Sequence, residues 1–219
     1  MTFMQEVLKK NYPIWDKCAT TPFVRELQGG TLSLDKFKNY MIQDSIYLKH
    51  YARIYGKAIY HSFVLKDIQM YYSILSFVTD TESAVRLSYL KQFGMTDDDI
   101  EEIEPLLECQ YYIDFMLKIA ENGNVCEILM AVLPCMLSYG YIFRKIAAMP
   151  NTDKSRYFDF IQDYSEDKYI ESEEGWIDFA NQKCEVLEIE EQEKLSRIFM
   201  QASLLELDFW EMVYSEVNQ

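Results

Sequence analysis

A thiol, a phenol and a proline lie close together in the most apolar stretch of the sequence, EILMAVLPCMLSYGYIFRKI, residues 127–146. Cys135 and Tyr139 are four residues apart, so they share one face of a helix. Pro134 removes a backbone donor and crowds the preceding turn, which kinks a helix and re-aims the residue that follows. Such a kink can turn the Cys135 thiol toward a cavity. The alternative is a packing kink beside a buried cysteine that acts as a small apolar side chain.

A carboxylate lies among tyrosines in NYMIQDSIYLKHYARI. Tyr40, Asp44, Tyr47 and Tyr51 recur at helical spacing and therefore share one otherwise apolar helix face. On the functional interpretation, Asp44 and the rings line a pocket. On the structural one, the carboxylate accepts a hydrogen bond from a tyrosine inside the core, because buried polar groups are normally paired.

A second carboxylate, Glu206, lies among apolar residues in FMQASLLELDFWEMVY, with Trp210 one helical turn later. Glutamate is rarely fully buried unless it is paired. One interpretation is that Glu206 bridges two helices. The other is that it shuttles protons, with a pKa set by an apolar site.

Aromatic residues are abundant, with 17 Tyr, 13 Phe and 3 Trp. Most must belong to the core. So many phenols near carboxylates also suit a pocket for a flat heteroaromatic ligand, because rings can stack on it and hydroxyls can reach its edge nitrogens. A carboxylate would pair with an amino group or a protonated ring nitrogen.

Long helices must position these side chains. Seven Gly and five Pro are few for 219 residues, and no alternating strand pattern bounded by turn residues is found, so the fold class is all-α. One domain over 1–219 is the simplest organisation at this length. Helices are predicted over 3–18 with Thr2 as cap, 22–28, 31–61 capped near Ser33, 64–92, a short segment of 95–102, 108–121, 124–148, two within 153–187 that break near 172–175, and 189–216.

Charge and composition exclude several partners and cofactors. A net charge of −15 disfavours nucleic acid and anionic membrane surfaces. The segment 127–146 is short and interrupted for a membrane span. Five cysteines without a CxxC pair, and an N-terminus without a secretory signal, predict reduced thiols and a cytoplasmic protein. Two histidines without a zinc motif or a Glu-x-x-His pair predict no metal.

Three stretches together resemble the TenA family, also called thiaminase II or aminopyrimidine aminohydrolase. They are PFVRELQGGTLSLDKFKNYMIQDSIYLKHYARI at 22–54, EILMAVLPCMLSYGY at 127–141 and LLELDFWEMVY at 204–214. The resemblance covers nearly the whole chain. It implies a haem-oxygenase-like helical bundle without haem, usually a homotetramer. It also implies hydrolysis of 4-amino-5-aminomethyl-2-methylpyrimidine to the hydroxymethylpyrimidine and ammonia in thiamin salvage, often with slower cleavage of thiamin itself.

The resemblance also assigns roles to residues. By it, Cys135 is the nucleophile and Glu206 the acid/base, while Asp44 contacts the aminopyrimidine. The matching pocket residues are Tyr47, Tyr112, Tyr139, Tyr164, Tyr51 and Trp210. No cofactor is implied.

The chain departs from the family pattern at three positions. Arg86 lies where a histidine is frequent, Leu205 replaces a frequent aromatic residue, and Met136 follows the cysteine. These departures bear on substrate preference and rate.

Two other classes of function compete with the hydrolase. A non-catalytic or regulatory protein would bind a pyrimidine or thiamin without turnover, and a helical scaffold would bind neither. A di-iron oxygenase lacks the required histidines in this sequence.

Overall fold

The computed structural model describes residues 1–76, 79 and 83–215, and every regular element in those residues is helical. The elements are α1 (Phe3–Cys18), α2 (Pro22–Gln28), α3 (Leu34–His61), α4 (Leu65–Ser76), α5 (Ser83–Gln92), α6 (Asp97–Glu101), α7 (Leu107–Asn122), α8 (Val125–Ala147), the 3-10 turn η2 (Thr152–Lys154), α9 (Phe158–Asp163), α10 (Asp167–Cys184) and α11 (Ile189–Met212). Their apolar faces meet in one core. The predicted all-α, single-domain fold is confirmed.

Several helices begin where the sequence supplies a polar cap. Thr2 accepts a hydrogen bond from the Gln5 amide, and the Gln5 side chain accepts one from the Thr2 amide. Ser33 caps α3 and Asn124 caps α8 through their side-chain oxygens. Such caps satisfy amides that have no partner within the helix. The predicted caps Thr2 and Ser33 are therefore confirmed, and α3 begins at Leu34, directly after its cap.

Three predicted boundaries differ from the structure. The break expected near 172–175 lies instead before Asp167, and α10 runs through Gly175. The continuous buried face of α10 outweighs the weak helix preference of one glycine. The last helix ends at Met212 and not at 216, which is outside the described residues. The helix predicted over 64–92 corresponds to α4 and α5, and residues 77–78 and 80–82 between them are also outside the described part.

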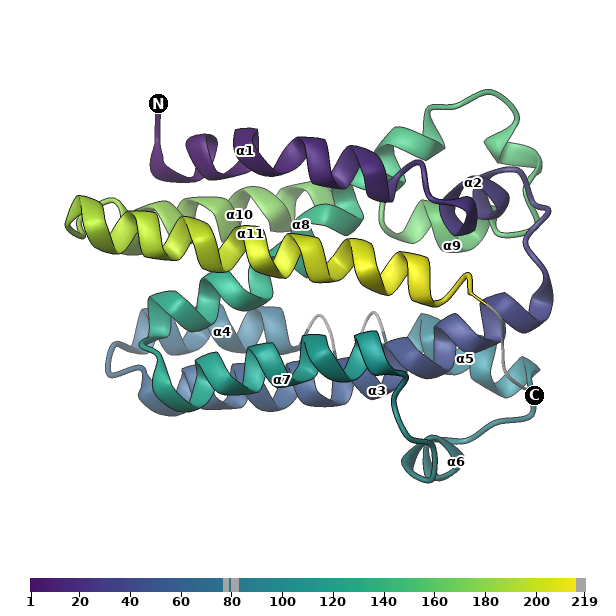
Figure 1. Cartoon of the computed structure of the whole chain (residues 1–219), viewed down its shortest axis with the longest axis horizontal. Helices are drawn as coiled ribbons and strands as arrows, with labels where there is room; N and C mark the ends of the chain where they lie inside the picture. The colour runs from purple at the N-terminus through teal and green to yellow at the C-terminus, as the bar shows by residue number, and fades with distance from the viewer. Residues whose placement is uncertain (77–78, 80–82, 216–219) are drawn as a thin grey trace.

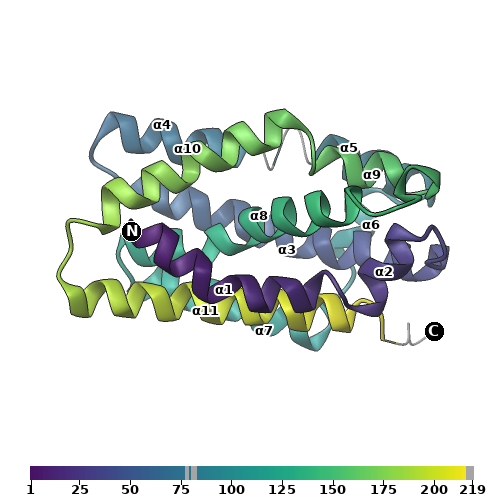
Figure 2. The same ribbon diagram turned by 90° about the horizontal axis from the view of Figure 1, so that it is seen from above.

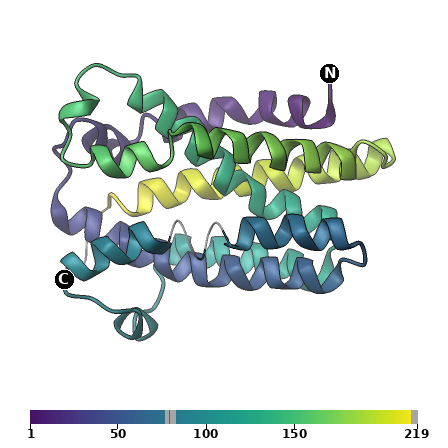
Figure 3. The same cartoon turned by 180° about the vertical axis from the view of Figure 1, so that it is seen from behind.

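The helices form a bundle around α8. In Figure 1, α1, α10 and α11 lie along one side, and α3, α4 and α7 lie along the other. Figure 2 shows α8 in the middle of the molecule, between α10 and α11, and Figure 3 shows the same bundle from behind. Helix α8 packs against α11, α10, α7, α3, α1 and α9. Residues on α8 are therefore the ones that most neighbours can reach.

Helix α8 is long and apolar enough to cross a membrane by length and composition alone. The expectation that this segment is too short for a span is thus wrong on length, because the helix has 23 residues. However, 78% of its most apolar window is buried inside the fold. It is the central core helix of the bundle.

Pro134 lies inside α8, and the helix continues through it. Two tyrosine hydroxyls donate hydrogen bonds to carbonyl oxygens on either side of the proline. Tyr51 donates to Val132 over 2.9 Å, and Tyr169 donates to Met136 over 2.7 Å. Neighbouring helices therefore contribute polar contacts to the segment of α8 that carries Cys135.

Candidate active site

Four helices surround a small cavity of about 10 Å³ in the core, which has room for about one water molecule. Its walls are Asp44 and Tyr47 from α3, Tyr112 from α7, Cys135 and Tyr139 from α8, and Glu206 and Phe209 from α11. Its aromatic walls offer ring faces to a flat ligand. The lining side chains must move apart before a pyrimidine ring can enter.

Glu206 is the centre of a buried hydrogen-bond cluster. Its side chain is 2% exposed. The Tyr112 hydroxyl donates to Glu206 Oε1 over 3.0 Å, and the Cys135 thiol also donates to this carboxylate. Burial raises the pKa of Glu206 to about 8, against the opposing effect of these two hydrogen bonds, and the nearby Asp44 charge raises it further. Glu206 can therefore exchange a proton with the thiol near neutral pH.

Asp44 faces the same cavity from α3 and is 6% exposed. Burial raises the pKa of its carboxyl to about 7. Two acidic groups with raised pKa values thus face one small space. Burying a carboxylate is energetically unfavourable, and carboxyl groups with raised pKa values are concentrated at functional sites.

The cavity tyrosines are neutral hydroxyl donors. Burial raises the pKa of Tyr47, Tyr112 and Tyr139 well above the usual value. The Tyr139 hydroxyl hydrogen-bonds the Tyr40 hydroxyl over 3.0 Å, and the Tyr47 hydroxyl donates to the Met116 sulfur over 3.5 Å. The rings of Tyr47 and Tyr112 are 4.9 Å apart between centroids. These contacts hold the rings in fixed orientations around the cavity.

Three of the residues assigned to the pocket by resemblance lie behind its wall. Tyr51 packs against Tyr47, with ring centroids 5.5 Å apart. Tyr164 and Trp210 each pack against Tyr139, both with centroids 5.2 Å away. The structure therefore brings Tyr51, Tyr164 and Trp210 to the site as supports of the lining rings.

Phe209 lines the cavity, whereas the family resemblance points to its neighbour Trp210. Phe209 is three residues after Glu206, and Trp210 is four residues after it, so both spacings fit the same helix face. Trp210 stacks instead on Tyr40, at 5.5 Å and 9°. The rotation of α11 about its own axis determines whether Phe209 or Trp210 lines the cavity. A single sequence gives no signal of that rotation, because both residues are aromatic.

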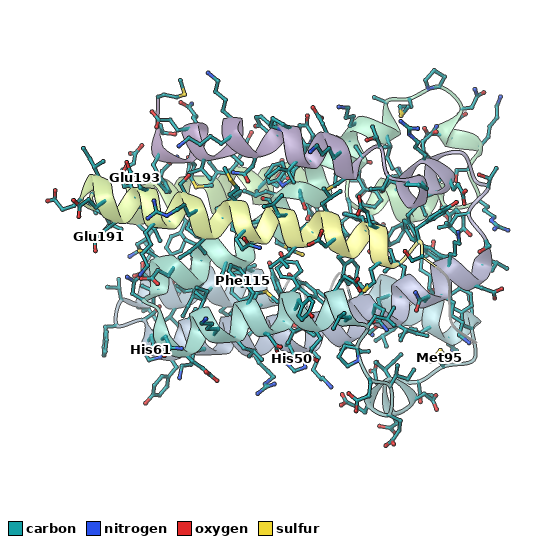
Figure 4. The ribbon with its side chains drawn as sticks, in the orientation of Figure 1. His50, His61, Met95, Phe115, Glu191 and Glu193 are labelled. Carbon is teal, nitrogen blue, oxygen red and sulfur yellow. The ribbon has the colours of Figure 1, made fainter. Side chains whose placement is uncertain are left out.

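The histidines lie away from this site. His50 and His61 are labelled in Figure 4 and project from α3 at the edge of the molecule. His61 is exposed. His50 is half-buried, and its Nδ1 atom is 3.0 Å from Nη1 of Arg53. Within the described ranges, no group of three or more His, Cys, Asp or Glu side chains is arranged to hold a metal ion.

Comparison with known proteins gives a consistent assignment. The model of the TENA/THI-4/PQQC family matches residues 8–216. An aminopyrimidine aminohydrolase from Halalkalibacterium halodurans is 31% identical over 99% of this chain and 97% of its own length. The solved structure of a TenA homologue from P. horikoshii has a TM-score of 0.87 and 27% identity, over 98% of this chain and 99% of that one.

A more distant structure identifies the fold. A Shewanella denitrificans domain described as having a heme oxygenase-like fold has a TM-score of 0.70 and 19% identity, over 96% of this chain and 91% of that one. The predicted haem-oxygenase-like bundle is therefore confirmed. Because the family model spans nearly the entire sequence, this chain belongs to the TENA/THI-4/PQQC family.

Proposed function

We propose that this protein is an aminopyrimidine aminohydrolase. It would convert 4-amino-5-aminomethyl-2-methylpyrimidine and water into 4-amino-5-hydroxymethyl-2-methylpyrimidine and ammonia, as a step in thiamin salvage. The observation that carries the proposal is the placement of the Cys135 thiol and the buried Glu206 carboxylate on the wall of one cavity, with Asp44 and three tyrosines around them. The name of the Halalkalibacterium halodurans relative supports the same class of reaction.

The cavity walls suggest how the ring is held. The aromatic side chains of Tyr47, Tyr112, Tyr139 and Phe209 offer faces against which a pyrimidine can pack. The Asp44 carboxylate would accept a hydrogen bond from the 4-amino group or pair with a protonated ring nitrogen. Such contacts fix the orientation of the ring relative to the Cys135 sulfur.

Covalent catalysis would begin with the transfer of a proton from Cys135 to Glu206. Glu206 takes the proton of the Cys135 thiol, and the thiolate adds to a carbon of the pyrimidine ring. Electron density from the ring then expels the aminomethyl nitrogen, and Glu206 returns its proton to that nitrogen. Ammonia leaves, and an exocyclic carbon–carbon double bond remains on the ring. Asp44 and the tyrosine hydroxyls would stabilise the charge that develops on the ring nitrogens.

Water completes the turnover. It adds to the exocyclic carbon while Glu206 accepts one of its protons. The ring regains its aromatic electrons by expelling the Cys135 sulfur, and the thiol recovers the proton from Glu206. One displacement with a poor leaving group is thereby divided into two easier steps.

Thiamin is the second substrate that we propose, with a lower rate. It carries the same aminopyrimidine, but a thiazolium ring replaces the amine. The cavity is smaller than one ring, so the larger thiamin would require a greater movement of the lining side chains than the aminomethylpyrimidine does. We expect the aminomethylpyrimidine to be the better substrate for this reason.

The test is turnover by the purified protein. The aminomethylpyrimidine should yield equal amounts of ammonia and hydroxymethylpyrimidine, the first measured enzymatically and the second by chromatography. Tight binding of the pyrimidine without ammonia would instead support a non-catalytic or regulatory binding protein. If the protein neither binds the pyrimidine nor turns it over, a helical scaffold is the remaining hypothesis.

We further propose a cytoplasmic homotetramer. Large apolar side chains are exposed around the turn from α3 to α4, at Tyr60, Phe63, Leu65 and Tyr72. Apolar surface of this kind is typical of contact sites between subunits. All five cysteines are free thiols, which suits a reducing compartment. Light scattering should give a mass four times the 26.0 kDa of one chain.

A further inference from the structure

An arginine lies on the other side of α3 from the candidate active site. Asp44 faces the catalytic cavity, while its neighbour Ser45 lines a second cavity whose walls also include Lys49, Arg86 and Asp97. Arg86 comes from α5, and its Nη1 donates a hydrogen bond to Ser45 Oγ over 2.9 Å. Adjacent residues of α3 thus face the two cavities, with Asp44 in the first and the Ser45 hydroxyl, bonded to the Arg86 guanidinium, in the second.

Arg86 is poorly neutralised where it lies. Its side chain is 13% exposed, and its Nε atom is buried without a hydrogen-bond partner among the described residues. Its ion pair with Asp97 is long, at 3.5 Å, and the Asp97 side chain is 64% exposed. Exposed ion pairs of this kind contribute little. Most of the positive charge of Arg86 therefore remains available to other groups nearby.

The Asp44 carboxyl is the group that this charge reaches. Burial raises the pKa of Asp44, and the positive charge of Arg86 opposes that rise. The titratable groups that face Asp44 from the other helices are Cys109 and Tyr112 on α7, Cys135 and Tyr139 on α8, and Glu206 on α11. All five are neutral or negative, so they cannot favour a second negative charge in the core. The positive charge of the Arg86 guanidinium does favour the negatively charged form of Asp44.

We propose that Arg86 is a positioning residue, which keeps Asp44 negatively charged for the pyrimidine from outside the catalytic cavity. Its hydrogen bond to Ser45 fixes the guanidinium against the turn of α3 that carries Asp44. The inference rests on the proposed function for the identity of the ligand. The coupling between Arg86 and Asp44 can be measured without any ligand.

The direct test is the titration of Asp44 by carbon-13 NMR of aspartate carboxyl groups, with Asp44→Asn to assign the signal. Loss of the Arg86 charge should raise the pKa of Asp44 in Arg86→Met by on the order of one unit. Arg86→Lys should retain most of the wild-type value. If Arg86→Met does not fold, as judged by circular dichroism, Arg86→Gln removes the charge and can still donate to Ser45.

Lys49→Met is the matched control. Lys49 lines the same outer cavity, but it pairs with Glu101 over 2.7 Å and is 41% exposed. Its removal should leave the Asp44 titration unchanged. Equal titration of Asp44 in wild type and in the uncharged Arg86 variants would overturn the inference, as would an equal shift in Lys49→Met.

Binding separates this inference from the proposed function. The affinity for 4-amino-5-hydroxymethyl-2-methylpyrimidine should weaken in Arg86→Met at low pH, by up to about tenfold for each unit of pKa shift, and match wild type at high pH. A shifted Asp44 titration with unchanged affinity at every pH would refute the positioning role. If the wild type binds no pyrimidine, the proposed function fails, and the NMR titration still decides whether Arg86 acts on Asp44.

Discussion

At the scale of single residues, chemistry depends on how many protons the cavity holds. The reactive form of Cys135 and Glu206 carries one proton between them, because the thiolate needs a proton acceptor that later serves as a donor. Burial raises the pKa of Glu206 to about 8 and that of Asp44 to about 7. Below these values both groups gain protons, so the pair loses its acceptor and the pyrimidine loses its carboxylate. We therefore expect kcat/KM to fall as the pH decreases from 8 to 6.

Tyr112→Phe tests the source of this pH dependence. The Tyr112 hydroxyl donates to the Glu206 carboxylate over 3.0 Å and so favours its charged form. Loss of that bond should raise the pKa of Glu206 and move the acidic limb of kcat/KM to higher pH, by roughly one unit. The measurement is the pH–rate profile of both proteins. Tyr51→Phe is the control, because Tyr51 donates to a backbone carbonyl and not to a carboxylate.

Residue types in the sequence were sufficient to select most of the cavity wall. A lone acid at helical spacing within an apolar face, as at Asp44 and Glu206, is costly to bury and therefore informative. Phe209 and Trp210 could not be separated in this way, because both are apolar and their choice depends on the rotation of α11. The distant partner Arg86 was visible only as a departure from the family pattern. Its approach to Asp44 depends on how α5 packs against α3.

At the scale of the helices, α8 and α10 meet over a glycine. The Glu173 side chain of α10 is paired with Arg144 of α8 at 2.7 Å and lies directly over Gly140. A Cβ atom at Gly140 would overlap the Glu173 carboxylate and approach the Arg144 guanidinium. The same packing explains why α10 continues through the expected break. Its buried positions include Tyr169, Glu173 and Trp176, and a polar Glu173 concealed that apolar face in the sequence.

Two glycine substitutions should therefore have opposite effects. Gly140→Ala should displace the Glu173–Arg144 pair and destabilise the fold by about 1–3 kcal/mol. Gly175→Ala should stabilise it by about 0.5–1 kcal/mol, because a Cβ there meets nothing within 4 Å and alanine favours the helix interior. Urea unfolding of both variants measures these changes. Equal stability of Gly140→Ala and wild type would contradict the described packing.

At the scale of the whole molecule, the bundle places one small polar cavity inside a large apolar core. The four helices that enclose it come from both halves of the chain, so the site exists only in the folded state. The amphipathic pattern predicted the helices and their class well, because helix periodicity is a local property. Their arrangement around α8 is not local, and only the family resemblance predicts it.

A ligand that binds this cavity should stabilise the fold by mass action. At about 100 times its Kd, the hydroxymethylpyrimidine would add about 2.7 kcal/mol to the free energy of unfolding. For a chain of this size, that raises Tm by roughly 5–10 °C. Asp44→Asn should reduce the rise by weakening the affinity, and differential scanning fluorimetry measures both. A scaffold without a pyrimidine site would show no shift in either protein.

Ammonia release from 4-amino-5-aminomethyl-2-methylpyrimidine, with wild type and Cys135→Ser side by side, tests the central claim most directly. A serine hydroxyl keeps the size and polarity of the thiol but is a much weaker nucleophile at neutral pH. We predict turnover by the wild type and its loss in Cys135→Ser, with pyrimidine binding and the far-ultraviolet circular dichroism spectrum retained. Full activity of the folded variant would contradict a covalent mechanism through Cys135.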